Sequence, residues 1–202
     1  MNVYFTRHGE TKDNKQKILI GQKEIPLTEN GKSQAIKLKK HIENSRIYFD
    51  TCYSSPLKRA IETAQIICGH DKIQIVPEIS EIDVGIASEK VCDDFLLEYP
   101  QFYHIGYYPD LNYPGGESLN EFFKRCSTWI NNTVLNISNQ DKSYFIIGHA
   151  GCINTMMHSI FSIPLIHYQA FHFEHCLLTH IKILFEKNYI KPEIIAFNSQ
   201  YA

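Results

Sequence analysis

Residues 3–11 read Val-Tyr-Phe-Thr-Arg-His-Gly-Glu-Thr, an apolar run followed directly by the polar segment Arg7-His8-Gly9-Glu10-Thr11. The apolar run predicts a short buried strand, which places the polar segment in the loop at its carboxyl end. Open α/β folds bind their ligands at that edge of the sheet. A neutral imidazole is a good nucleophile toward phosphorus, and a guanidinium binds a phosphate dianion through paired hydrogen bonds. The segment therefore predicts a site of phosphoryl transfer.

Three more predicted strands are each followed by a candidate catalytic side chain: Arg59 after residues 50–54, Glu81 after 73–76 and His149 after 144–147. A single histidine at a strand end is more often a structural hydrogen-bond donor than a catalyst. The agreement of separate segments is what favours a functional site. We expect these side chains to meet where the strands end.

Strands and helices alternate along the chain. We expect strands at 1–6, 50–54, 73–76, 144–147, 171–185 and 193–197, and helices that begin at Thr28, cover 56–68, follow Ser118 and cover 152–161. Thr28 suits a helix N-cap and Gly69 a C-cap. Strands separated by helices imply a mainly parallel sheet with helices on both faces, an α/β fold in three layers.

Composition sets broad limits on the class of protein. The chain has 202 residues, 44% of them hydrophobic, which fits one domain spanning residues 1–202. A net charge of -2 gives no electrostatic reason to expect nucleic acid as a partner. No apolar stretch is long enough to span a membrane, and the N-terminus does not resemble a signal peptide, so we expect no membrane association and a cytoplasmic location. A homodimer is compatible with the sequence, which leaves the oligomeric state open.

Cysteines and histidines give no metal-site pattern. The six cysteines form no Cys-x-x-Cys pair, and we expect reduced, mostly buried thiols. Four histidines lie near the C-terminus: His167, His172, His175 and His180. If 171–175 is a strand, His172 shares a face with Glu174 while His175 lies on the opposite face, and this spacing does not force ligands to converge. We therefore expect no metal.

Together these motifs resemble the histidine phosphatase superfamily, which also contains the cofactor-dependent phosphoglycerate mutases. The matching segments, in order, are Arg7 to Thr11, Pro26 to Gly31 with Gln34-Ala35, Ser54 to Ala64, Glu81 with Gly85, Pro114 to Ser118, and His149. The short length and the Pro-Gly-Gly-Glu-Ser element are most similar to the small phosphatases, such as α-ribazole phosphatases and broad-specificity phosphatases. The resemblance also implies one antiparallel strand near an edge of the sheet.

The residue types predict a metal-independent, cofactor-free reaction on a small-molecule phosphate ester. His8 attacks phosphorus to give a phosphohistidine, and cationic groups stabilise the charge on the transferred group. The expected phosphate-binding residues are Arg7, Asn14, Arg59, His149 and Ala150; the resemblance supports Asn14 and His149 in that role. Glu81 is the expected general acid for the leaving oxygen and must be protonated for that step.

The stretch 86–117 is an expected lid-like insertion, rich in tyrosine and phenylalanine. In the resembling enzymes the corresponding insertion folds over the active site. The alternative is a satellite hydrophobic cluster under a long loop. We expect Gly21, Gln22 and Tyr103 to bind the substrate.

The sequence also departs from the family pattern. Residues 86–90 read Ile-Ala-Ser-Glu-Lys where an aromatic residue and a second glycine are usual, and Ala150 replaces a glycine. The Arg-His-Tyr segment that mutases carry after the acid is replaced by residues 82–84, Ile-Asp-Val. A phosphomonoesterase is therefore preferred over a phosphoglycerate mutase. A catalytically weak phosphate-binding protein is disfavoured because all the expected catalytic groups are present.

Overall fold

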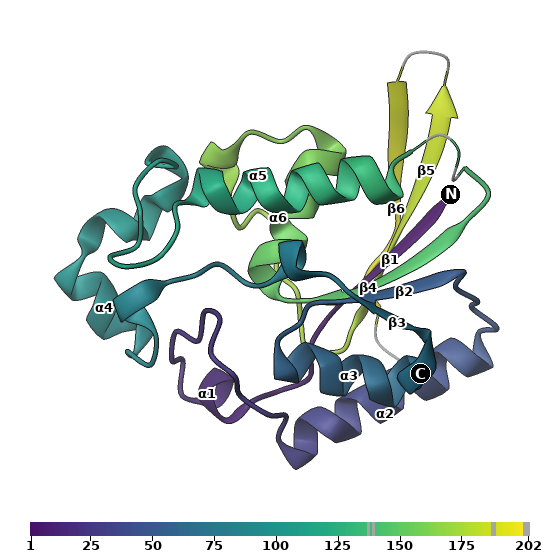
Figure 1. Ribbon diagram of the computed structural model, residues 1–202, viewed down its shortest axis with the longest axis horizontal. Coiled ribbons are helices and arrows are strands. Elements are labelled where there is room, and N and C mark those ends of the chain that lie inside the picture. The colour runs from purple at the N-terminus through teal and green to yellow at the C-terminus, as the bar shows by residue number, and fades with distance from the viewer. Residues whose placement is uncertain (137, 139, 187–188, 200–202) are drawn as a thin grey trace.

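A sheet of six strands forms the centre of the protein, described here from a computed structural model (Figure 1). The structure describes residues 1–136, 138, 140–186 and 189–199. The strand order is β3-β2-β4-β1-β5-β6. Their bounds are β1 Asn2–Arg7, β2 Thr51–Ser54, β3 Ile73–Ile75, β4 Ser143–Gly148, β5 Leu178–Glu186 and β6 Tyr189–Ser199.

Parallel pairing brings the predicted strand ends together. β1, β2 and β3 all run in the direction of β4, while β5 is antiparallel to both β1 and β6. The mainly parallel sheet with one antiparallel strand next to an edge is thus confirmed. Arg7 pairs with Gly148 and Ser54 with Ile147, so the segments that follow β1, β2 and β4 leave the sheet side by side.

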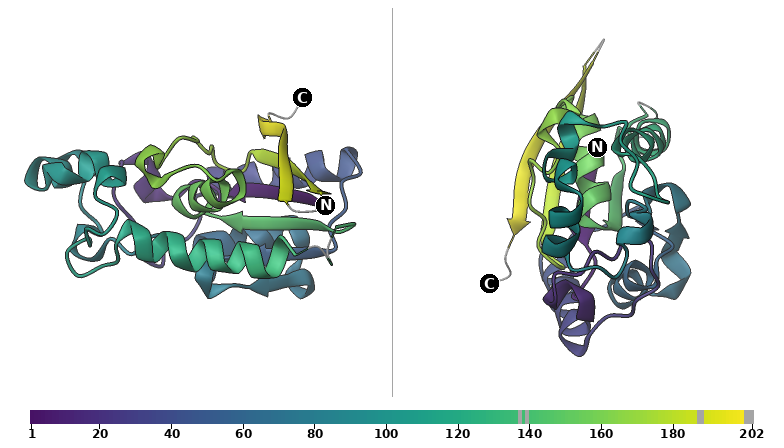
Figure 2. Two further views of the ribbon diagram at one scale, coloured as in Figure 1. Left: turned by 90° about the horizontal axis from the view of Figure 1, so that it is seen from above. Right: turned by 90° about the vertical axis from the view of Figure 1, so that its left-hand side faces the viewer.

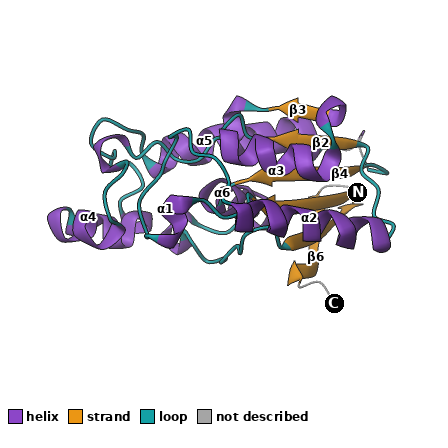
Figure 3. Cartoon of the chain, turned by 90° about the horizontal axis from the view of Figure 1, so that it is seen from below, coloured by secondary structure: helices purple, strands orange, loops and turns teal. Residues whose placement is uncertain are grey.

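Helices cover both faces of the sheet, which confirms the three layers (Figures 1 and 3). α2 (Glu29–Asn44) and α3 (Lys58–Cys68) cover one face, and α5 (Leu119–Trp129) and α6 (Ala150–Phe161) cover the other. Both faces of β1 are apolar because both are covered: Tyr4 packs toward α2 and α3, while Phe5 packs toward α5 and α6. Among the described residues, no helix is both long and apolar enough to cross a membrane.

Shorter helices complete the chain. They are α1 (Lys12–Lys15), α4 (Cys92–Glu98), a π-helical turn (Ile130–Val134) and the 3-10 helices His70–Lys72, Pro77–Ile79, Gly85–Ala87, Pro100–Tyr107 and Leu165–His167. α4 and its neighbours stand away from the sheet at one end of the molecule (Figures 1 and 2). There the rings of Phe95 and Tyr99 stack at 4.9 Å, and those of Phe102 and Tyr113 lie 4.4 Å apart. Phe95, Tyr99, Phe102 and Tyr113 therefore form a hydrophobic cluster, whereas Tyr103, Tyr107 and Tyr108 are exposed. The function of the insertion as a lid stays a prediction.

Several predicted boundaries are wrong. The strand expected over 193–197 is β6, Tyr189–Ser199, and the helix expected over 152–161 begins at Ala150. α3 begins at Lys58 and not at Pro56, because Leu57 is still extended and its N–H donates to the Ser55 hydroxyl. The strand expected over 171–185 begins only at Leu178. The backbone of 171–177 instead bonds to side chains, such as that of Asn154, which binds both polar groups of Phe171. The prediction that His172 and Glu174 share one face of a strand is wrong, because residues 171–177 form no strand. By contrast, Thr28 and Gly69 cap their helices as predicted.

Candidate active site

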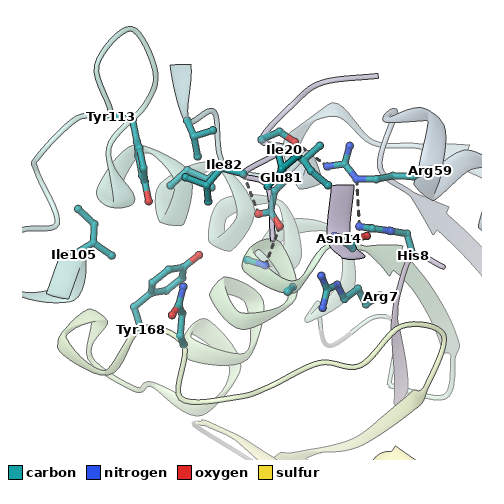
Figure 4. Close-up of a pocket in the computed structure, with 17 residues that line it drawn as sticks. Arg7, His8, Asn14, Ile20, Arg59, Glu81, Ile82, Ile105, Tyr113 and Tyr168 are labelled. Carbon is teal, nitrogen blue, oxygen red and sulfur yellow. Dashed lines mark hydrogen bonds between the residues drawn. The ribbon is translucent and has the colours of Figure 1, made fainter. Parts of the chain in front are cut away.

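A cavity of about 310 Å³ lies beyond the carboxyl ends of β1, β2 and β4 (Figure 4). Its lining includes most of the predicted site residues: Arg7, His8, Asn14, Gly21, Arg59, Glu81 and Ala150. His149 lies beside it, with its ring centroid 5.1 Å from that of His8. The structure therefore brings together residues that are up to 143 positions apart. The volume suits a small-molecule ligand.

The hydrogen bonds of His8 fix which ring nitrogen carries its proton. Nδ1 lies 2.7 Å from the carbonyl oxygen of Gly9, and a carbonyl only accepts, so Nδ1 is protonated. Nε2 lies 3.2 Å from Nε of Arg59, whose N–H donates to it. Nε2 therefore holds the lone pair, and Figure 4 shows it directed at the Arg59 guanidinium beside the cavity. Nε2 is thus the ring nitrogen with nucleophilic character, and in this structure its lone pair accepts the hydrogen bond from Arg59.

Burial keeps His8 neutral. Its side chain is buried, and burial lowers its pKa well below 6.5, with His149, Arg59 and Arg7 acting in the same direction. A protonated imidazole has no lone pair on Nε2 and cannot attack. The buried, cationic surroundings therefore keep the lone pair on Nε2 of His8.

The two arginines are held by main-chain carbonyls. Arg59 is 1% exposed and donates from Nη1 to Lys23 and from Nη2 to Gly21, each at 2.8 Å. Gly21 has a φ of +55°, a conformation that favours glycine. Burial lowers the pKa of Arg59 to about 10, which leaves it charged at neutral pH. Arg7 donates from Nη1 to Phe173, while its buried Nε finds no partner among the described residues.

His149 has, within the residues described, a second buried nitrogen without a hydrogen-bond partner, its ring Nδ1. It is the N-cap residue of α6, and its Nε2 lies 2.8 Å from the Ser55 hydroxyl. When that hydroxyl donates to Nε2, the proton of the neutral ring is on Nδ1. Burial lowers the pKa of His149 well below 6.5, and Nδ1 has no partner in the described part of the chain. In that tautomer, the Nδ1–H of His149 and the Nε–H of Arg7 are both donors left unpaired by the described residues, and they suit an anionic ligand.

Asn14 reaches the cavity from a tight local structure. Its Oδ1 accepts from the backbone N–H of Thr11 at 3.1 Å and from the Thr11 hydroxyl at 2.8 Å, while Thr11 caps α1. This use of Oδ1 leaves the Nδ2 group as the donor for a ligand. The predicted phosphate contact of Asn14 therefore has a suitable group in place, although the contact itself stays a prediction.

Glu81 faces the cavity from a loop and is held by two backbone N–H groups. Oε1 accepts from Ile82 at 2.9 Å and Oε2 from Gly151 at 3.0 Å, as Figure 4 shows. Gly151 lies in the first turn of α6, and a Cβ there would lie 2.2 Å from Oε1 of Glu81. Only glycine at position 151 leaves room for this carboxylate.

Several residues of the site carried no clear signal in the sequence. Ser55 follows β2 and orients His149; Gly151 makes room for Glu81. His175 lies in the irregular segment before β5, donates from Nδ1 to the His8 carbonyl at 2.7 Å, and has its pKa lowered to about 4 by burial. Tyr168 lines the cavity, and Figure 4 shows its hydroxyl directed toward Glu81. Burial raises the pKa of that phenol well above 10.

The remaining predicted substrate residues lie farther out. Gln22 donates to the carbonyl of Glu81 at 3.0 Å, so its side chain is bound to the loop that carries Glu81. Tyr103 is 56% exposed and lines a neighbouring cavity of about 340 Å³. The two cavities share part of their lining: Leu19, Ile105, Tyr113, Tyr168 and Gln169. Contact of Gln22 and Tyr103 with a substrate stays a prediction. No group of three or more potential metal ligands occurs among the residues that the structure describes.

Comparison with known proteins agrees with this geometry. Residues 3–192 match the histidine phosphatase superfamily (branch 1). The chain is 28% identical over 163 residues to the broad-specificity phosphatase YOR283W of Saccharomyces cerevisiae, covering 78% of this chain and 69% of that protein. It is 29% identical over 169 residues to "Probable phosphoglycerate mutase GpmB" of Cronobacter sakazakii, covering 81% and 76%.

A solved structure extends the likeness to three dimensions. A phosphoserine phosphatase from Entamoeba histolytica superimposes with a TM-score of 0.82 at 26% identity, covering 98% of this chain and 96% of that one. The match over residues 3–192 covers nearly the whole chain. The chain therefore belongs to the histidine phosphatase superfamily.

Proposed function

We propose that this protein hydrolyses small-molecule phosphomonoesters, without a metal, through a phosphohistidine on His8. One observation supports this most strongly. His8 Nε2 and Arg7 line one cavity, His149 lies beside it, and two buried nitrogens of this group, Arg7 Nε and His149 Nδ1, have no hydrogen-bond partner in the described part of the chain. Buried donors are nearly always paired, so unpaired ones beside a nucleophile favour an anionic substrate.

The first step transfers the phosphoryl group to His8. The N–H of Arg59 turns from Nε2 to a phosphate oxygen. Nε2 then forms a bond to phosphorus as the ester P–O bond breaks, and the leaving oxygen takes the proton of Glu81. Negative charge spreads over three oxygens of the transferred group, where Arg7, Arg59 and His149 stabilise it. The positive charge that a metal would supply comes from the two guanidinium groups.

The second step regenerates the enzyme. Glu81, now ionised, takes a proton from water, the water oxygen bonds to phosphorus, and the bond to Nε2 breaks. Inorganic phosphate leaves, and Glu81 is again protonated for the next cycle. A water that approaches from the side of the leaving group meets Glu81 directly, because that carboxylate lines the same cavity.

The leaving-group end of the cavity favours an uncharged alcohol or phenol. Arg7 and Arg59 are the only lysine or arginine residues in the described lining, and both belong to the phosphate end. Away from that end, and apart from Glu81, the described lining is apolar or phenolic except for the amide of Gln169, and the neighbouring cavity has no Asp, Glu, Lys or Arg among its described lining residues. A mutase must also hold the carboxylate and second phosphate of its bisphosphorylated intermediate, for which this end offers no cation.

The test is hydrolysis of p-nitrophenyl phosphate and a panel of natural phosphomonoesters, with EDTA present, by wild type and His8→Ala. We expect turnover that resists EDTA and is lost in His8→Ala, and His70→Ala, an exposed histidine, is the matched control. Retained turnover in His8→Ala would reject the nucleophile, and a need for added metal would reject the metal-free reaction.

Two alternatives are tested in the same preparation. A mutase would convert 3-phosphoglycerate to its isomer in the presence of 2,3-bisphosphoglycerate, and we expect no isomerisation. A phosphate-binding protein would bind the esters without turnover. Its affinity for the esters can be compared with the affinity of wild type for inorganic phosphate.

A further inference from the structure

The loop that carries Glu81 has little secondary structure of its own. Glu81 lies between the 3-10 helices Pro77–Ile79 and Gly85–Ala87, where no strand or helix fixes the backbone. The carboxylate is held at its tip by backbone N–H groups, but a general acid also needs its own main chain fixed. Hydrogen bonds to the main-chain carbonyl groups of residues 78–81 fix this backbone.

Arg125, on α5, binds this loop with its whole guanidinium group. Nη1 donates to the carbonyls of Glu78 at 2.7 Å and Ser80 at 2.8 Å, and Nη2 donates to the carbonyl of Glu81 at 2.9 Å. The two remaining N–H groups form a bidentate pair with Glu117, with Nε at 3.0 Å from Oε2 and Nη2 at 2.6 Å from Oε1. Five donors thus meet five oxygens.

Glu117 connects the same network to the other side of the loop. Its Oε1 also accepts from the backbone N–H of Asp83 at 2.8 Å, and its own N–H donates to the Asp83 carbonyl at 3.0 Å. The side chains of Arg125 and Glu117 are 23% and 17% exposed. An ion pair this sheltered and this fully bonded has a defined geometry, unlike an exposed pair.

We infer that Arg125, together with Glu117, is the positioning residue of the general acid: it holds the backbone on both sides of Glu81 so that the carboxylate faces the leaving oxygen. This inference depends on the proposed function, because it requires Glu81 to act as the acid. Lysine cannot replace arginine here, since one ammonium group cannot bind a carboxylate in bidentate fashion and three carbonyls as well.

The test compares phenyl phosphate, whose leaving group needs protonation, with p-nitrophenyl phosphate, whose leaving group needs little. We expect Arg125→Lys to lower kcat/KM on the order of 10- to 100-fold for phenyl phosphate and about 3-fold for p-nitrophenyl phosphate, because a small displacement of the acid is costly. The loss falls on kcat more than on KM. Lys124→Gln, an exposed neighbour on α5, is the matched control.

A double-mutant cycle separates positioning from a general structural effect. In a Glu81→Gln background the acid is already absent, so Arg125→Lys should change kcat/KM for phenyl phosphate by less than about 2-fold. Losses that multiply in that background, or equal losses on both substrates, overturn the inference.

A milder variant keeps the test decisive if Arg125→Lys does not fold. Glu117→Gln retains the size of the side chain, but its amide cannot accept from all three N–H groups that Glu117 binds. We expect kcat/KM for phenyl phosphate again to fall more than that for p-nitrophenyl phosphate, but by a smaller factor than in Arg125→Lys. If Glu117→Gln lowers both values equally, the inference is overturned. If Glu81→Gln itself treats both substrates alike, the acid assignment in the proposed function fails first.

Discussion

Gly151→Ala should impair the general acid while leaving the fold intact. A Cβ at position 151 would lie 2.2 Å from Oε1 and 3.0 Å from Cδ of Glu81, and 2.9 Å from the hydroxyl oxygen of Tyr168. Ordinary Cβ contacts begin at about 3.4 Å, so Oε1 must recede by about 1.2 Å. A displacement near 1 Å costs about 100-fold in rate, or about 2.7 kcal/mol. We expect that loss in kcat/KM for phenyl phosphate, and less than about 5-fold for p-nitrophenyl phosphate.

Stability should not follow activity in this variant. The atoms nearest to the added methyl group belong to the ends of two side chains, Glu81 and Tyr168, and not to the backbone. Because alanine also suits a helix better than glycine, the free energy of unfolding should stay within about 1 kcal/mol of wild type. Gly69→Ala is the converse control: its φ is +79° with nothing near the added atom, so it should lose stability and keep activity. Wild-type rates for Gly151→Ala on both substrates, or equal losses on both, would refute the reasoning.

Three other perturbations test the rest of the site. Ser55→Ala removes the hydrogen-bond partner of His149 Nε2. We expect kcat/KM to fall at least about 10-fold and the free energy of unfolding in urea to fall by about 1–3 kcal/mol. Ser54→Ala is the control and should keep wild-type rates, because the Ser54 hydroxyl binds only a carbonyl. Because burial lowers the pKa of His8 below 6.5, the unfolded chain binds a proton that the folded one does not, and stability should fall as pH drops below about 6.5. His8→Asn should reduce that slope by up to about 1.4 kcal/mol per pH unit in urea titrations, and an unchanged slope would contradict a neutral buried His8. Gln169→Lys places a cation where the two cavities meet. The added ammonium group should attract the carboxylate of 3-phosphoglycerate, so kcat/KM for this substrate should rise about 5-fold relative to that for p-nitrophenyl phosphate. If the ratio does not rise, the proposal that the leaving-group end is uncharged is contradicted.

The residues of the site that could be predicted from the sequence are those that follow a strand. Residues after parallel strands meet at one edge of the sheet, so His8, Arg59 and His149 could be placed together from their positions after apolar runs. That logic reaches only residues that follow a strand. Arg125 lies within a helix, and its guanidinium reaches a loop 44 positions earlier in the chain, so no local pattern could indicate its role.

Irregular backbone explains the other differences. Alternation over 171–175 suggests a strand, but side chains such as Asn154 satisfy this backbone and β5 begins at Leu178. His175 consequently lies beside His8 and not on a sheet face. Likewise, nothing in the sequence around Gly151 indicates why this position must be glycine. The reason is that the carboxylate of Glu81, distant in the sequence, lies where a Cβ would be.

The central claim is that His8 Nε2 becomes covalently bonded to phosphorus. Rapid acid-free quenching of wild type during turnover of a labelled phosphomonoester, followed by peptide mass analysis under alkaline conditions, tests it most directly. The account predicts one phosphoryl group on the imidazole of His8, accumulating further in Glu81→Gln with p-nitrophenyl phosphate because water is then not activated. Turnover with no phosphorylated His8 under these conditions, or a phosphoryl group on another residue, would contradict it.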